Sequence, residues 1–297
     1  MRIIACANQK GGCGKTTTAI NLAYFLSVKG ANVLLIDFDP QAHATMGLSI
    51  DPSGLEISMY DVIKPWDDAS RRINDVLIGI GEGFDLAPSS ASLSAVEQEL
   101  SGQTGRESKL LGAIKALQRT YDYIIIDCPP SIGHLCFNAL RACEEVIIPI
   151  DLSLFSLRGV SKLQEIITAL KEKLDHDIKA RALITMYDNR TRYSRQVFNE
   201  VKGVFRNNMF ETVIRYNIRL RETGDCGMPI GEYDKHAIGY KDYEDLAEEV
   251  IGSRAHEVSQ ESTDEHPPHI YHPSQQDMPE PVGDELARSE YMMKENT

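Results

Sequence analysis

The sequence lacks long apolar runs, paired cysteines and an excess of basic residues. No stretch approaches the roughly 18 consecutive apolar residues that a membrane-spanning helix requires. The six cysteines include no Cys-x-x-Cys pair, which argues against a disulfide framework and against a zinc or iron–sulfur site. The residues before the first glycine are too few for a signal peptide. These absences predict a protein of the reducing cytoplasm without a membrane partner.

Charge and composition narrow the possible functions further. The 297 residues are 42% hydrophobic and 25% charged, which is typical of a globular protein with a sizeable core. They contain 31 Lys and Arg against 44 Asp and Glu, so the net charge is −13. This balance excludes a globally basic nucleic-acid binder. It leaves room for a local basic patch, because the sum does not say where the charges lie.

The composition changes near Ser253. Residues 253–297 contain ten acidic and three basic residues and few strong aliphatics. Such a segment cannot bury enough apolar area to offset its loss of conformational entropy. We therefore predict one folded domain over residues 1–252 and a disordered acidic tail over residues 253–297. A solvated tract is favoured over a metal site for the loosely spaced tail histidines, which are His256, His266, His269 and His272.

Residues 1–252 alternate apolar runs with helical patterns. Val33–Phe38 and Tyr123–Asp127 contain continuous aliphatic blocks, as expected for strands buried on both faces of a parallel sheet. Apolar residues recur at helical spacing in Leu157–Leu174. The other expected strands are Ile3–Ala7, Phe84–Ala87, Glu145–Ile150 and Ala182–Met186. This alternation predicts an α/β fold, with a single-domain, open and mostly parallel sheet covered by helices on both faces.

A glycine-rich loop carries the strongest chemical signal. It reads Asn-Gln-Lys-Gly-Gly-Cys-Gly-Lys-Thr-Thr over residues 8–17, follows the first expected strand and opens a helix expected over Thr17–Lys29. Glycines let backbone amides approach phosphate oxygens, and a helix N-terminus adds partial positive charge. Lys15 is expected to reach the β- and γ-phosphates, and the Thr16 hydroxyl to hold Mg²⁺. The pattern G-x-x-x-x-G-K-[ST] lacks its first glycine here, and a second lysine, Lys10, begins the loop instead.

Two further strand ends carry carboxylates. Asp127 ends an aliphatic run, at the place where a Mg²⁺-coordinating water needs a carboxylate. Asp37 and Asp39 lie at the end of the second expected strand, at the edge where ligands bind in open α/β sheets. One of these two can orient or deprotonate an attacking water. A helix cap at a strand-end turn is the structural alternative.

The three elements together resemble the ParA/Soj branch of the deviant Walker A ATPases, within the ParA/MinD superfamily. The matching motifs are Lys-Gly-Gly-x-Gly-Lys-Thr-Thr-Thr, Asp-x-Asp-Pro-Gln and Ile-Ile-Asp-Cys-Pro-Pro-Ser, in the expected order and separation. A fourth stretch, Thr212–Leu220, matches with some drift. The resemblance covers residues 1–252.

The resemblance implies a Mg²⁺-dependent ATPase that acts as a switch in chromosome or plasmid partitioning. ATP would drive homodimerisation, the dimer would bind DNA without sequence preference, and a ParB/Spo0J-like centromere-binding protein would stimulate hydrolysis. Lys10 would reach the phosphates of the other subunit, as an arginine finger does, and Asp39 would position the water. Thr16 and Asp127 would hold Mg²⁺. The implied nucleotide contacts are Lys10, Gly11, Gly12, Cys13, Gly14, Lys15, Thr16, Thr17, Met186 and Asn217.

The chain departs from the family pattern beside the expected adenine site. Family members usually carry Pro before Arg-Asn and continue Arg-Leu-Ser-Glu-Ala-Pro. This chain reads Arg-Tyr-Asn over residues 215–217 and Arg-Leu-Arg-Glu-Thr-Gly over residues 219–224. Cys13 replaces a more usual small aliphatic residue. A thiol at a helix N-terminus can have a lowered pKa and sense oxidants, and the alternative is a plain small loop residue.

A basic stretch is the candidate DNA surface. Residues 190–221 hold eight bases, seven of them arginines, and two acids. Arginine suits bidentate phosphate contact, and a solvated charged face is the alternative. The resemblance selects Arg190 and Arg219 as DNA contacts. The adjacent Arg221, which departs from the family pattern, adds positive charge and is the third expected contact. A DNA-binding protein of this kind would be associated with the nucleoid. Such a surface should bind with strong salt dependence. The acidic tail could compete with DNA for it, so deletion of residues 253–297 should tighten DNA binding.

Three other functions compete with partitioning. A ParA-like positioner of a protein cargo has the same core chemistry, so the sequence does not separate the two. A MinD-like membrane switch that regulates the division site needs a C-terminal amphipathic helix with a basic face, which the acidic tail does not supply. A nitrogenase-reductase-like electron carrier needs cluster-ligating cysteines at a dimer seam, and Cys128, Cys136 and Cys143 offer no such pattern.

Overall fold

The computed structural model describes residues 1–64, 72–152 and 156–260, and residues 1–260 form one compact unit. Helix α11 (Ile238–Gln260) runs past residue 252. The domain boundary expected there therefore falls inside a helix, which includes His256. The other histidines of the expected tail lie outside the described residues, as does everything from residue 261 onward.

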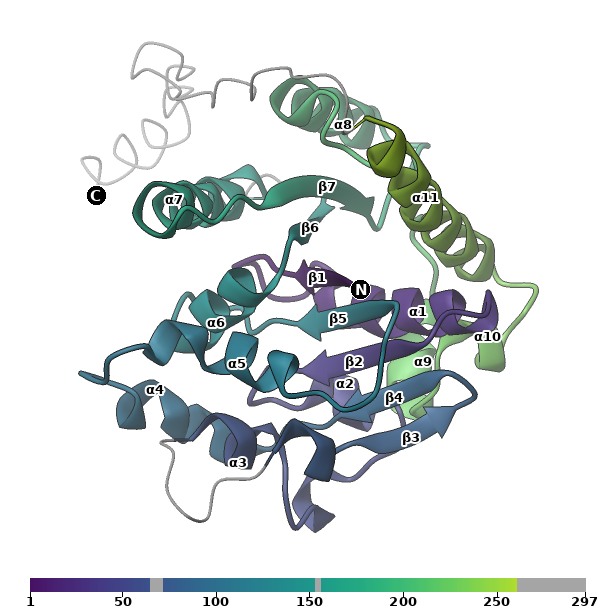
Figure 1. Ribbon diagram of the computed structural model, residues 1–297. Helices are drawn as coiled ribbons and strands as arrows, with labels where there is room; N and C mark the ends of the chain where they lie inside the picture. Colours follow the sequence, from purple (N-terminus) through teal and green to yellow (C-terminus); the bar gives the residue numbers. More distant parts are fainter. Residues whose placement is uncertain (65–71, 153–155, 261–297) are drawn as a thin grey trace, which may run out of the picture. The chain divides into compact units, whose positions relative to one another are not determined.

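A seven-stranded sheet forms the centre of the unit (Figure 1). Its order is β3-β4-β2-β5-β1-β6-β7, and all neighbouring pairs are parallel except β3 with β4. The strands are β1 (Arg2–Cys6), β2 (Val33–Asp37), β3 (Ile78–Gly81), β4 (Phe84–Ala87), β5 (Tyr123–Asp127), β6 (Glu145–Asp151) and β7 (Lys179–Thr185). The predicted fold class is confirmed. Strand β3 was not expected, because its sequence Ile-Gly-Ile-Gly contains no apolar run.

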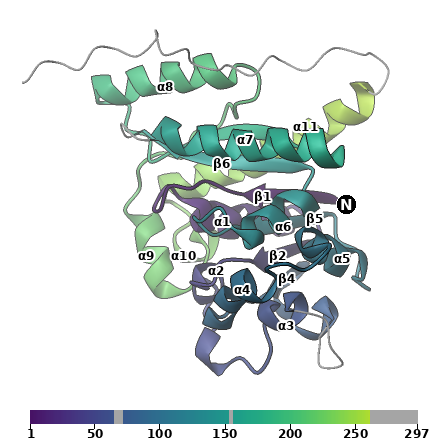
Figure 2. The same cartoon turned by 90° about the vertical axis from the view of Figure 1, so that its left-hand side faces the viewer.

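Helices cover both faces of the sheet (Figures 1 and 2). One face packs against helices α3 to α8, and the other against α1, α2, α10 and α11. The helices are α1 (Lys15–Val28), α2 (His43–Met46), α3 (Met59–Ile63), α4 (Val96–Glu99), α5 (Lys109–Lys115), α6 (His134–Ala142), α7 (Ser156–Leu174), α8 (Arg192–Phe205), α9 (Arg219–Cys226), α10 (Ile230–Tyr233) and α11. Within the described residues, none of them has the length and apolar character needed to cross a membrane.

The central strands are buried on both faces, which explains their continuous aliphatic runs. In β1, Ile3 and Ala5 point into one core, and Ile4 and Cys6 into the other. Successive side chains of a strand face opposite sides of a sheet, so a two-layer cover requires apolar residues at every position. Each fully buried aliphatic side chain contributes about 1.5–3 kcal/mol to folding.

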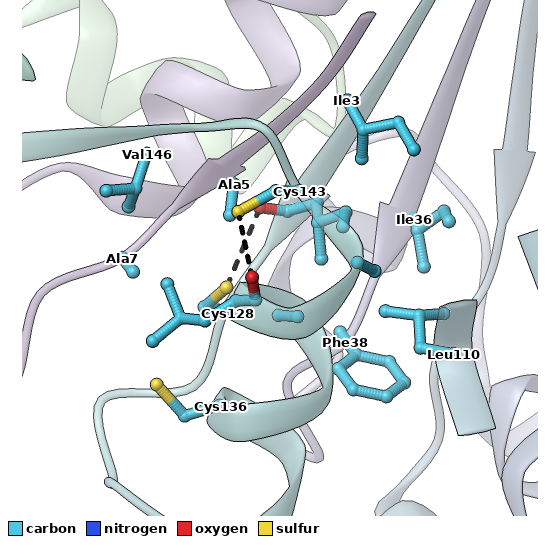
Figure 3. Packing of buried hydrophobic residues seen from close by; sticks show 14 of the residues in the cluster. Ile3, Ala5, Ala7, Ile36, Phe38, Leu110, Cys128, Cys136, Cys143 and Val146 are labelled. Atoms are coloured by element: carbon cyan, nitrogen blue, oxygen red, sulfur yellow. Dashed lines mark hydrogen bonds between the residues drawn. The ribbon is translucent and has the colours of Figure 1, made fainter. Parts of the chain in front are cut away.

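Three cysteines that had no assigned role are small core residues. Figure 3 shows the side chains of Cys128, Cys136 and Cys143 among apolar groups around the end of β5 and helix α6. Burial raises the pKa of all three thiols, and that of Cys136 reaches about 12. Neutral, buried thiols of this kind pack as small apolar groups and are chemically inert.

The sheet register brings the three acidic and glycine-rich motifs to one edge. Asp127 at the end of β5 lies between Asp37 of β2 and Cys6 of β1. The loops that follow these strands therefore leave the sheet side by side. This is the carboxyl edge, where open α/β sheets bind their ligands.

Candidate nucleotide site

The loop between β1 and α1 has the backbone of an anion-binding loop. Gly12 and Gly14 have φ angles of +74° and +92°, in the left-handed region that favours glycine. Gly14 is the N-cap of α1, and no side chain caps this helix end. The first amides of α1 therefore point into the loop without a side-chain acceptor, and together with the helix dipole they favour an anion there.

Lys15 is held inside this loop. Its side chain is buried, and its ammonium donates to the carbonyl oxygen of Lys10 at 3.2 Å. The thiol of Cys13 donates to the same carbonyl at 3.1 Å. On the other side of the loop, the hydroxyl of Thr185 at the end of β7 donates to the carbonyl of Cys13 at 2.8 Å. The carbonyl oxygen of Lys10, which carries no formal charge, is thus the one hydrogen-bond partner of the Lys15 ammonium among the described residues.

Cys13 is a structural residue of the loop rather than an oxidant sensor. Its side chain is fully buried, and this burial raises the pKa of the thiol. Lys15 acts in the opposite direction without reversing the shift. The thiol-sensor alternative required a lowered pKa, which depends on solvent access that the fold removes. The alternative reading of Cys13 as a small loop residue agrees with the structure.

Lys10 contacts an acid that the sequence did not point to. Its ammonium lies 2.7 and 2.5 Å from the two carboxylate oxygens of Asp151, at the end of β6. Strand β6 is the neighbour of β1, so the two strand ends meet although they are 141 residues apart. Both side chains are partly exposed. The Lys10 side chain is therefore held by a residue of its own subunit in this structure.

Asp127 is a fully buried carboxylate next to the Thr16 hydroxyl. Neither of its oxygens accepts a hydrogen bond from any residue in the described ranges. Burial raises the pKa of Asp127 well above its usual value, and the charge of Asp37 adds to this rise. The nearby Thr16 hydroxyl acts in the opposite direction. A bound cation would stabilise the charged form of this buried carboxylate. This fits the Mg²⁺ site expected at Thr16 and Asp127.

The two acids after β2 have different surroundings. Asp37 accepts hydrogen bonds from the amide and the hydroxyl of Thr45, both at 2.7 Å, and from the amide of Asp39. Its role is structural, and burial raises its pKa to about 6. One carboxylate oxygen of Asp39 accepts from the amide of Gln41 at 3.0 Å, and no described residue donates to the other. Asp39 is therefore the acid left to meet a ligand.

Ser89 connects the Asp39 loop to the next strand. Its hydroxyl donates to the carbonyl oxygen of Asp39 at 2.7 Å, and its amide donates to the hydroxyl of Thr45 at 3.0 Å. Sequence reasoning missed this residue, because nothing in its local pattern distinguishes it from other serines after a strand. The two bonds fix the backbone from which the Asp39 carboxylate extends.

The expected base-side residues come together at the end of β7. Met186 follows this strand with a left-handed φ of +54°. The amide of the next residue, Tyr187, donates to the carbonyl of Ile214, and the Tyr216 amide donates back to Tyr187. These bonds place Met186 close to residues 216–217. Since Thr185 contacts the phosphate loop, the segment lies next to the phosphate end of the site.

The comparisons with known proteins agree with this geometry. A family model described as an AAA domain, AAA_31, matches residues 1–180. The chain is 42% identical to the sporulation initiation inhibitor protein Soj of Bacillus subtilis over 253 residues, which are 85% of this chain and 99% of Soj. It is 39% identical to the chromosome partitioning protein ParA of Myxococcus xanthus over 252 residues, 84% of this chain and 88% of that ParA. The chain belongs to the ParA/Soj family of chromosome-partitioning proteins.

A solved structure with the same fold contains a bound nucleotide analogue. Cobyrinic acid a,c-diamide synthase of Mycobacterium smegmatis, crystallised with an ATP analogue and magnesium, superposes with a TM-score of 0.72 at 31% identity. The match covers 86% of this chain and 96% of that protein. The ParA/Soj chain thus shares its architecture with a biosynthetic enzyme, so the fold alone does not decide what this chain acts on.

The basic stretch of this ParA/Soj chain is less positive than the sequence count indicated. Arg190 forms an ion pair with Asp188 at 2.7 Å, and Arg219 lies 2.9 Å from Glu222 and 3.6 Å from Asp234. These acids lie outside residues 190–221, which is why the count missed them. Both pairs are exposed, and exposed pairs contribute only about 0–1 kcal/mol. A phosphate group can therefore replace these carboxylates.

Five other cations of the stretch are exposed and form no ion pair with a residue that the structure describes: Arg192, Arg195, Lys202, Arg206 and Arg221. Three of them belong to α8, at separations of three and seven residues, which places them on one side of that helix. The opposite side of α8 carries Val197, Val201 and Phe205 into the core. The basic surface is therefore real, and more of it lies on α8 than the family pattern alone indicated.

Proposed function

We propose that the chain is a Mg²⁺-dependent ATPase whose ATP-bound homodimer binds DNA without sequence preference and serves chromosome or plasmid partitioning. One observation carries the proposal. The phosphate loop, with Lys15 inside it, lies beside the buried carboxylate of Asp127 at the same sheet edge, and the described residues give that carboxylate no cation of its own. A phosphate chain and a divalent cation satisfy both at once.

Mg²⁺ would be held by the Thr16 hydroxyl and, through water, by Asp127. When bound, it would neutralise charge on the β- and γ-phosphate oxygens. Lys15 would bind the same phosphates within its own subunit. The carboxylate oxygen of Asp39 without a described donor would then accept a hydrogen bond from the attacking water and hold it in line. The bonds from Ser89 keep the Asp39 backbone in place for this task.

Lys10 would serve the phosphates of the other subunit. To reach them, its ammonium has to leave Asp151, and the Coulomb energy of that pair is partly screened because both groups are partly exposed. A second, negatively charged triphosphate offers more charge than one carboxylate. Dimerisation would therefore be coupled to the presence of the γ-phosphate, and a ParB/Spo0J-like partner would act on the assembled dimer.

DNA would bind through the exposed cations of residues 190–221, with Arg190, Arg219 and Arg221 as the expected contacts. A backbone-reading surface releases counterions, so its affinity should fall steeply as salt is raised. The acidic balance of the whole chain, −13, does not prevent this, because the patch is local.

The decisive experiment uses the full chain with Asp39→Ala. This variant should bind ATP and dimerise without turning over, so its DNA affinity can be measured in a stable state. We expect binding to arbitrary duplex DNA with ATP, at least about tenfold weaker binding with ADP, and a steep loss between 50 and 200 mM salt, as a surface making several phosphate contacts shows. The Lys15→Ala, Asp39→Ala double variant is the control that cannot hold the nucleotide. Equal binding with ATP and ADP, or none with either, would contradict the proposal.

A further inference from the structure

Arg215, one of the eight bases of the candidate DNA surface, is engaged elsewhere. Its Nε and Nη2 atoms donate to Oδ1 of Asp242 at 2.9 and 2.5 Å, and its backbone amide donates to Oδ2 at 2.8 Å. Asp242 belongs to α11, and only 3% of it is exposed. Side chain and main chain of one arginine thus saturate one buried carboxylate, an arrangement more rigid than the exposed pairs of Arg190 and Arg219.

This contact fixes the segment that carries the base-side residues. Arg215 precedes Tyr216 and Asn217, and a parallel bridge joins it to Tyr187. The Tyr216 amide donates to Tyr187 at 3.1 Å, so Arg215 lies in the middle of a segment held from both sides. Among the described residues, Asp242 is the one acid that forms an ion pair with Arg215.

The next residue of α11 reaches the phosphate side. The hydroxyl of Tyr243 lies 3.2 Å from the hydroxyl of Thr18, in α1 directly after the phosphate loop, and Tyr243 is fully buried. Two successive residues at the start of α11 therefore hold the two halves of the nucleotide site: Asp242 the base side and Tyr243 the phosphate side. Loss of the Arg215–Asp242 contact would release residues 215–217, while the Thr18–Tyr243 contact would still hold α1.

We propose that Arg215 is a positioning residue of the nucleotide site, which through Asp242 sets residues 216–217 and so the residence time of a bound adenine nucleotide, and is not a DNA contact. The inference rests on the proposed function. A lysine in place of Arg215 keeps the charge that DNA would need, but it cannot form the forked contact with Asp242. The two roles therefore separate in one substitution.

The test measures dissociation of a fluorescent ADP from the full chain by stopped flow, with Arg215→Ala and Arg215→Lys. We expect about tenfold faster dissociation for Arg215→Ala and most of that increase for Arg215→Lys, because both substitutions remove the forked contact with Asp242. Competition by pyrophosphate, which has no base, should be unchanged in both. The matched control is Arg119→Ala, which removes an exposed arginine that pairs with Asp85 before the amino end of β5, and it should show wild-type dissociation.

DNA binding supplies the opposing readout. In the Asp39→Ala background with ATP, Arg215→Lys should keep the wild-type salt slope. Wild-type ADP dissociation in Arg215→Ala, or a salt slope reduced by about one in that variant, would overturn the inference and return Arg215 to the DNA surface. If the unsubstituted chain binds neither nucleotide, the proposed function itself fails, and this outcome is distinct from the other two.

A double-mutant cycle tests the partner. Asp242→Asn removes the charge and retains an acceptor. If the two residues act through one shared contact, the double variant with Arg215→Ala should release ADP no faster than the faster-releasing of the two single variants. Additive effects would mean that the two residues act independently. Melting temperatures of all variants, taken without nucleotide, show whether a change reflects the folded site or a loss of fold.

Discussion

The phosphate side of the molecule, which is the loop over residues 8–17 and the strand ends beside it, differs from the basic side, residues 190–221, in where the partners of its charged groups come from. On the phosphate side, the backbone of the loop is set within one short motif, as with Lys15 and the carbonyl of Lys10, although distant residues such as Thr185 also contact it. On the basic side, the state of each arginine depends on acids in other elements, such as Asp234 and Asp242. Backbone geometry can be read from a local motif, whereas the net charge of a surface depends on what the fold brings beside it.

The sharpest division between the two sides is expected for Lys15→Ala. The ammonium of Lys15 is buried in the phosphate loop, whereas that of Lys10 pairs with Asp151. Loss of Lys15 should therefore weaken ATP binding by about 100-fold or more, as expected when a buried charge-assisted contact is lost. Titration of a fluorescent ATP analogue measures this. Lys10→Ala is the matched control, which should retain binding in one subunit and lose stimulated hydrolysis. Comparable ATP affinities for both variants would contradict the separate roles of the two lysines.

Charge reversal tests the basic side. Arg219→Glu should keep ATP-dependent dimerisation and lower DNA affinity by about tenfold or more, since it removes one cation and leaves Glu222 and Asp234 uncompensated. Filter binding at low salt, together with light scattering for the dimer, checks both properties. Arg219→Ala should lose less than the reversal. Retained DNA binding by Arg219→Glu would remove this residue from the DNA surface.

Asp127→Asn should have opposite effects on the ligand-free and the magnesium-bound chain. Removing a buried charge that has no described partner should stabilise the ligand-free protein by about 1–3 kcal/mol, or raise its Tm by about 2–8 °C. The same change should abolish the extra stabilisation that Mg²⁺ with ADP gives the wild type. Scanning calorimetry with and without Mg²⁺ measures both, and an unchanged Mg²⁺ effect would argue against Asp127 as part of the site.

The smallest effect is expected for Asp151→Asn, which loosens the hold on Lys10. A partly exposed pair is worth about 1 kcal/mol or less, so ATP-dependent dimerisation should become about two- to fivefold tighter. Sedimentation of the hydrolysis-deficient Asp39→Ala background with ATP detects this shift. Weaker dimerisation would mean that Asp151 assists Lys10 in the dimer.

Much of the fold and the phosphate side could be predicted because the signals there are local. Apolar runs, several of them continuous, identified six of the seven strands. The glycine-rich motif identified the phosphate loop, in which Gly12 and Gly14 have left-handed backbone. Strand β3 escaped, because an antiparallel edge strand with alternating glycines has no apolar run. The strand pattern alone leaves Asp37 and Asp39 equivalent, and the family resemblance selects Asp39. In the structure Thr45 donates its hydrogen bonds to Asp37 and not to Asp39.

The basic side could be located but not resolved. The count over residues 190–221 gave the correct region, and it could not assign single residues because ion pairs are formed in three dimensions. Asp151 and Asp242 escaped for the same reason, since neither belongs to a motif. Each is recognisable only through its partner, Lys10 in one case and Arg215 in the other.

The central position of β1 has a consequence for the order in which the chain folds during synthesis. Strand β1 is made first, but both of its neighbours, β5 and β6, come more than 100 residues later. At about 5–20 residues per second, the ribosome needs several seconds or more to supply them. Until then β1 has no neighbouring strand to pair with, so the glycine-rich loop that follows it is not held at the edge of a sheet. The glycine-rich loop is thus among the first parts of the chain to be synthesised and among the last to be assembled.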